Sequence, residues 1–141
     1  MIQVHFENVE VPGFNQELFC SWLEEVVCLE GFLLGDIQYV FCSDDYLLDI
    51  NRRFLNHDYY TDIVTFDYCE NQLVSGDLFV SIERVSDNST DFSASFFDEF
   101  LRVCVHGVLH LLGYKDKSEE DIKTMRDKEQ FYLDRYVSRG T

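Results

Sequence analysis

The sequence predicts an α+β fold: a single compact domain spanning residues 1–141, with about a four-stranded mixed sheet and about five helices. Short segments in which apolar and polar residues alternate, as in half-buried strands, are interspersed with longer segments that have helical spacing and capping residues. The chain has 141 residues, 46% of them hydrophobic, which is enough for one domain with its own core. No repeat or linker divides the sequence.

In the first half of the chain, strands and helices are expected to alternate. The strands are identified by their apolar alternation, and the helices by side chains suited to cap a first turn, Asn15 and Ser43. Gly31 is placed to end the first helix. The predicted elements are the strand Ile2–Glu7, a helix from Asn15 to about Glu30, the strand Phe32–Cys42 and a helix from Asp44 to about Phe54.

The second half is expected to add two strands and three helices. Gly76 and Asp77 are predicted to open the fourth strand, and the pattern Ser118-x-x-Asp121 resembles a capping box at the start of the last helix. The predicted elements are the strands Thr61–Tyr68 and Leu78–Ile82, a short helix at Ile82–Ser89, a long helix from about Phe92 to Leu112 and a helix from Ser118 to about Val137.

Composition indicates a cytoplasmic protein without a membrane partner. Met1–Glu10 carries no basic segment of the kind found in signal peptides, and no run approaches the roughly 20 apolar residues that cross a bilayer. The cysteines are odd in number and form no C-x-x-C pair, so they are predicted to be small buried thiols in a reducing compartment. They are Cys20, Cys28, Cys42, Cys69 and Cys104.

The net charge of −16 argues against a nonspecific nucleic-acid-binding protein. Proteins of that class usually carry a basic face for the phosphate backbone. An RNA substrate would therefore need a local basic patch, or presentation by a partner.

The most informative stretch is His106–Asp116, which reads HGVLHLLGYKD and predicts a zincin-like metal helix. His106 and His110 lie one helical turn apart, so both imidazoles can reach one metal ion. Gly113 is placed to end the helix, and Asp116 to return a carboxylate to the same ion. This pattern matches the three-ligand layout of metzincins with Asp as third ligand. Three protein ligands leave a position for water, as in catalytic zinc sites.

Gly107 stands where metalloproteases have the glutamate that acts as general base, so the sequence does not predict an ordinary zinc protease. The glycine could instead allow the helix backbone to approach a neighbouring element. The alternative for His106 and His110 is that they are buried, hydrogen-bonded residues of a core helix, because their segment is apolar nearly all round. Their combination with a glycine and an aspartate in register favours the metal site.

Three blocks of sequence together match one known family. They are HGVLHLLGYKD followed by Met125 and Glu129; Asn51–Phe54 with Asp58 and Thr61–Phe66; and Gly76–Leu78. On these residues the chain resembles the YbeY family of metal-dependent endoribonucleases, which process small-subunit ribosomal RNA. The family pattern for the first block is H-G-x-L-H-L-x-G-Y-D-H, so Asp116 replaces a histidine.

The resemblance implies a single-strand-specific endoribonuclease that acts in small-subunit rRNA maturation and ribosome quality control. It implies one Zn²⁺ per chain, bound by His106, His110 and Asp116, and a metal-bound water that attacks an RNA phosphodiester. No side-chain base is assigned. The carboxylate of Asp116 is an acceptable zinc ligand that could also admit other oxygen-favouring divalent metals. The expected partners are ribosomal RNA and the small ribosomal subunit, with ribosome-associated proteins possible.

Leu55 stands where the family usually has an arginine thought to contact phosphate. Arg52, Arg53 and His57 are candidates to replace it, although a charged pair at a helix end is commonly a solvated end that complements the helix dipole. Asp62 completes the candidate substrate-binding set. It could alternatively accept a hydrogen bond from a ligand histidine, or from the backbone at the start of its strand.

Two other functions remain open from the sequence. One is a ribosome-assembly factor whose metal is mainly structural, which the charge of −16 and Leu55 would suit. The other is a different metal hydrolase, such as a peptidase or amidase, against which the missing glutamate counts. Loss of function in a folded His106→Ala variant would favour the enzyme over the assembly factor.

Overall fold

The computed structural model describes residues 1–139, and within them it has the predicted α+β architecture, with five helices and a four-stranded mixed sheet. Residues 140–141, which the predicted domain includes, lie outside this range. The elements are β1 (Ile2–Phe6), α1 (Gln16–Leu29), β2 (Leu33–Cys42), α2 (Asp44–Phe54), β3 (Ile63–Asp67), β4 (Leu73–Ser81), α3 (Ile82–Asp91), α4 (Phe96–Leu111) and α5 (Glu119–Arg139).

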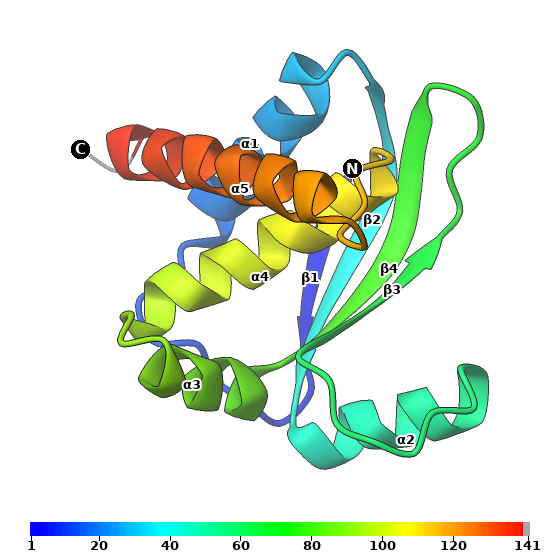
Figure 1. The fold of residues 1–141 in the computed structure, drawn as a ribbon, viewed down its shortest axis with the longest axis vertical. Helices are drawn as coiled ribbons and strands as arrows, with labels where there is room; N and C mark the ends of the chain where they lie inside the picture. The colour runs from blue at the N-terminus through cyan, green and yellow to red at the C-terminus, as the bar shows by residue number, and fades with distance from the viewer. Residues whose placement is uncertain (140–141) are drawn as a thin grey trace.

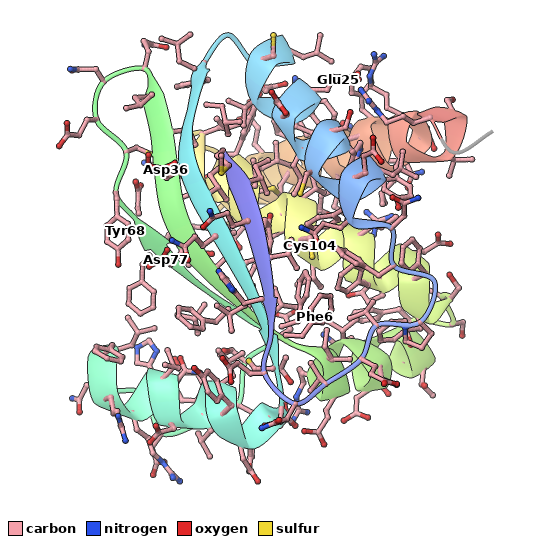
Figure 2. The ribbon with its side chains drawn as sticks, turned by 180° about the vertical axis from the view of Figure 1, so that it is seen from behind. Phe6, Glu25, Asp36, Tyr68, Asp77 and Cys104 are labelled. Carbon is pink, nitrogen blue, oxygen red and sulfur yellow. The ribbon has the colours of Figure 1, made fainter. Side chains whose placement is uncertain are left out.

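The sheet has the strand order β1-β2-β4-β3, with β3 antiparallel to β4 and the other pairs parallel. Alternate residues of β2, Ile37, Tyr39 and Phe41, are fully buried in the main core with residues of α1 and α4. On the other face, Cys42 and Val64 pack with α2 in a smaller cluster. In the view from behind, the strands lie in front of α4 (Figure 2).

Helix ends follow the predicted caps. The Asn15 side chain accepts a hydrogen bond from the backbone N–H of Leu18 at 3.0 Å, and Ser43 accepts one from Tyr46 at 3.1 Å. Ser118 caps α5 in the same way. Each cap satisfies a backbone donor that has no partner within the helix, so these boundaries are determined locally.

Two predicted boundaries are wrong. The long helix does not begin at Phe92, which is the C-cap residue that follows α3. Helix α4 starts after Ser95, which accepts a hydrogen bond from Asp98 N at 3.1 Å. The fourth strand begins at Leu73, so Gly76 lies inside it. A Cβ on Gly76 would lie 2.6 Å from the Phe66 carbonyl oxygen, so the glycine permits close approach of a neighbouring strand and does not mark a strand start.

The cysteine prediction is confirmed only in part. All five are free thiols, and Cys42 and Cys104 are buried, but Cys28 is exposed on α1. Cys28 lies near the end of α1, on the helix face opposite the buried stripe. No helix within residues 1–139 combines the length and the apolar character needed to span a membrane.

Candidate metal centre

The three predicted metal ligands meet in space. His106 and His110 project from α4, and their Nε2 atoms lie 2.9 Å apart. The helix ends at Leu111, and Gly113, with a φ of +104°, turns the chain so that Asp116 comes back towards the histidines. Asp116 Oδ2 lies 3.3 Å from His110 Nε2 and 3.5 Å from His106 Nε2. The cluster could therefore hold a metal ion.

The spacing of these donor atoms fits a small divalent ion. Ligands at 2.0–2.2 Å from a tetrahedral zinc lie about 3.3–3.6 Å from one another. Both distances from the Asp116 oxygen, 3.3 and 3.5 Å, fall in this range. The separation of the histidine nitrogens, 2.9 Å, is shorter and needs only a small movement of the rings. Two imidazoles and one carboxylate form a donor set found at catalytic zinc sites.

The remaining ring nitrogens fix the orientation of both histidines. His110 Nδ1 donates to the Tyr114 carbonyl oxygen at 2.9 Å, and His106 Nδ1 donates to Glu129 Oε2 at 2.7 Å. A neutral imidazole with its proton on Nδ1 presents the Nε2 lone pair to a metal. Glu129 is buried and also accepts from Arg102 Nη1 at 3.1 Å, so its carboxylate is held on both oxygens.

The charged groups around His106 favour a positive charge at its ring, either a proton or a metal ion. Burial by itself lowers the pKa of His106, but the hydrogen bond and charge of Glu129, with the charges of Asp116 and Asp62, outweigh burial and raise it. The same anionic surroundings that favour a proton on the imidazole also favour a bound metal ion.

A second, partly buried carboxylate holds the loop that follows α4. Glu30, just after α1, accepts from Tyr114 Oη at 2.5 Å, from Lys128 Nζ at 3.0 Å and from the hydroxyl of Tyr132. Tyr114 is the residue whose carbonyl receives the His110 proton. Glu30 thus ties α1 and α5 to the loop between the second and third candidate ligands. Its role could not be read from the sequence, because it lies far from the motif along the chain.

The cluster borders a cleft of about 590 Å³. The cleft is lined by residues of α4 and α5, by the turn between α3 and α4, and by the start of β3, and α4 runs between α3 and α5 (Figure 1). Its charged lining residues are Asp62, Glu99, Asp116, Glu129, Arg102 and Arg126.

Three of the predicted substrate contacts lie outside this cleft. Arg52, Arg53 and His57 are not among the lining residues. Arg52 forms an ion pair with Asp58, and Arg53 Nε lies 3.0 Å from Asp49 Oδ2. Both pairs are largely exposed at the end of α2. The structure therefore does not bring these residues together with the metal cluster.

Asp62 does line the cleft, but within residues 1–139 it forms no hydrogen bond with a ligand histidine; the carboxylate that orients His106 is that of Glu129. Asp62 Oδ2 accepts from Asn88 Nδ2 at 3.2 Å. Burial raises the pKa of Asp62, against the opposing charge of His106 and backbone hydrogen bonds. Glu129 belonged to the matched sequence blocks, and its place in the motif was the only signal for its role.

Glu99 is a second cleft carboxyl with a raised pKa. It is buried on α4, and its burial raises the pKa while the charges of Arg102 and Arg126 oppose the rise and those of Asp62 and Glu129 add to it. The folded state therefore binds the Glu99 proton more tightly than the unfolded state does. Ionised Glu99 consequently lowers the stability of the fold at neutral pH.

We expect Glu99→Gln to stabilise the protein at pH 7 and to have little effect near pH 4. The stability penalty of wild-type Glu99 is absent below the ordinary glutamate pKa, grows as the pH rises to the folded-state pKa, and then stays constant. Urea unfolding of both proteins across this range measures the difference. Asp98→Asn, which changes an exposed acid on the same helix, is the control and should show no such trend. A constant difference between wild type and Glu99→Gln at all pH values would contradict the prediction.

Gly107 faces the sheet. A Cβ at this position would lie 2.5 Å from Leu78 Cδ2 and 2.7 Å from Ile63 Cδ1. Such distances are too short for real Cβ contacts, so the glycine permits α4 to pack against β3 and β4. This supports the packing explanation for Gly107. A side chain at this position would start against Leu78 and Ile63 and could not enter the cleft freely.

Comparisons with known proteins agree with this geometry. A family model described as Endoribonuclease YbeY matches residues 3–137. The chain is similar to an Endoribonuclease YbeY from Flavobacterium johnsoniae, with 49% identity over 92% of each chain. It is 43% identical to the protein of that name from Phocaeicola vulgatus, over 92% of this chain and 94% of the relative. A solution structure of a Thermotoga maritima protein aligns with a TM-score of 0.70 and 29% identity, covering 98% of this chain and 90% of that one.

Proposed function

We propose, from the premise that this chain belongs to the YbeY family of endoribonucleases, that it is a zinc-dependent, single-strand-specific enzyme of small-subunit rRNA maturation and ribosome quality control. As a family member it is an endoribonuclease, a hydrolase. The observation that carries the proposal is the cluster of His106, His110 and Asp116 at the border of a large cleft. A ribosomal RNA substrate implies the small ribosomal subunit as partner and the cytoplasm as the place of action.

His106, His110 and Asp116 would hold one Zn²⁺ per chain, and the carboxylate ligand would also suit other oxygen-favouring divalent ions. When bound, such an ion supplies a Lewis acid for the phosphoryl oxygen and lowers the pKa of water. The protein's own contribution is orientation. Glu129 and the Tyr114 carbonyl hold the two imidazoles in the tautomer that binds metal.

No side chain is assigned as general base, because Gly107 packs against the sheet. Asp62 and Glu99 are the cleft carboxyls whose pKa is raised, chiefly by burial, so they are able to hold a proton within the site at higher pH than an exposed acid. The buried walls of the cleft, Val103 and Met125 among them, exclude part of the solvent from bound RNA.

RNA cleavage by metal-loaded protein tests this function. We expect cleavage of a labelled single-stranded oligoribonucleotide, at least about tenfold slower cleavage of the same strand annealed to its complement, loss of activity with chelator and recovery with added zinc. The duplex is the matched control, because it has the same sequence and nearly the same chemistry. Stoichiometric zinc without RNA cleavage would contradict the proposal and favour an assembly factor with a structural metal.

A further inference from the structure

We propose that Arg126, an exposed residue of α5 that lines the cleft, binds an RNA phosphate beside the metal cluster and is the main side-chain cation for substrate binding in this chain. The inference rests on the proposed function. It identifies a substrate-binding residue outside the set predicted from the sequence, Arg52, Arg53, His57 and Asp62.

The position of Arg126 follows from its neighbour on α5. Arg126 precedes Glu129 by three residues, so the two lie on adjacent positions of one helix face. Glu129 forms the 2.7 Å hydrogen bond to His106 Nδ1. Arg126 and His106 line the same cleft. Arg126 therefore lies on the α5 wall of the cleft that His106 and Asp116 also line.

Arg126 differs from the other arginine of the cleft. Arg102 is engaged, because its Nη1 bonds Glu129 at 3.1 Å and its Nη2 bonds the Gln130 side chain at 2.9 Å. Arg126 forms no hydrogen bond or ion pair with any other residue in the described range 1–139 and acts on Glu99 only through its charge. Its guanidinium is thus available to a ligand.

The charge of the cleft explains why such a cation is needed. Four acids and two arginines line the cleft, and the whole chain carries a net charge of −16. A bound Zn²⁺ would offset the charge of the lining, but the chain as a whole stays strongly negative, so a phosphate of the RNA that does not contact the ion is repelled unless a side-chain cation compensates it. A guanidinium binds two phosphate oxygens at once, which suits Arg126 to this role. Arg52 and Arg53 are outside the cleft and already paired with Asp58 and Asp49.

Kinetics of the zinc-loaded protein on a short single-stranded RNA test the role of Arg126. We expect Arg126→Gln to raise KM about tenfold, because one charge-assisted hydrogen-bonding contact is lost. The value of kcat should change less, and the zinc content should not change. The slope of log kcat/KM against log salt concentration should become less steep by about one, because one phosphate contact is lost. Arg126→Lys, which keeps the charge but not the planar fork, should give an intermediate KM.

Lys123→Gln is the matched control. It removes one positive charge from the same helix, but Lys123 lies outside the cleft lining and pairs with Asp127 at 2.8 Å. Its KM and salt slope should equal those of wild type. If wild type cleaves RNA and Arg126→Gln matches Lys123→Gln in both quantities, the role of Arg126 is wrong while the proposed function stands. If wild type with stoichiometric zinc cleaves no RNA, the proposed function fails, and this inference fails with it.

Discussion

Replacement of His110 by alanine is expected to abolish stoichiometric zinc binding and to lower kcat/KM for RNA by on the order of 10³-fold, while the protein stays folded. The variant removes one of three candidate ligands. Little packing is lost, because the His110 side chain is 32% exposed and water can replace its hydrogen bond to the Tyr114 carbonyl. Metal content by mass spectrometry, on protein purified without added metal, and thermal unfolding check the two parts of the prediction.

His57→Ala is the control for this variant. It is the same chemical change at a histidine that was predicted from the sequence to contact substrate but lies outside the cleft lining. We expect it to retain metal. Asp116→Asn tests the third ligand: it keeps the shape and removes the charge, and should weaken zinc binding at least about tenfold. Full metal occupancy in His110→Ala would show that the metal is bound outside this cluster. Loss of metal in His57→Ala would show that the loop after α2 contributes to the metal site.

The candidate ligands could be predicted because their arrangement is local. His106 and His110 are brought together by one helical turn, and the glycine that returns Asp116 is within the same stretch. Of the groups that orient these ligands, the Tyr114 carbonyl is local, but the side chains that hold His106 and Tyr114 come from far along the chain. Glu129 lies on α5, and Glu30 follows α1. Their contribution depends on how whole helices pack, which apolar spacing along a single helix does not determine.

The fold shows the same division between local and distant causes. The starts of α1, α2 and α5 were predictable because a single side chain caps each of them. The start of α4 was missed because apolar residues continue through Phe92–Leu112, so only the cap at Ser95 marks the break. Gly76 was misread because a glycine in a strand has two causes, a strand end or the close approach of another backbone. Only the structure, which shows Phe66 beside it, separates them.

Gly107 raises the same ambiguity, and here the outcome is a prediction with a large effect. We expect Gly107→Glu to destabilise the protein by more than about 3 kcal/mol and to add no catalytic base. The new side chain would start against Leu78, which is fully buried, and Ile63, and the carboxylate would have to be buried or the helix displaced. The midpoint and slope of urea unfolding, measured with chelator present, give the change in free energy independently of metal.

Gly107→Ala separates the effect of an added methyl group on stability from the effect of the buried carboxylate. Its Cβ has the same clashes, but the atoms it meets are the ends of flexible side chains, and alanine favours a helix by about 1 kcal/mol over glycine. We therefore expect a loss of about 1–2 kcal/mol, well below that of Gly107→Glu. If Gly107→Glu were as stable as wild type and cleaved RNA faster, position 107 would face the cleft and not the sheet. The absence of the zincin glutamate would then have a catalytic reason. If both variants lose stability as expected, the glutamate is absent because α4 packs too closely on β3 and β4 to admit a side chain at position 107.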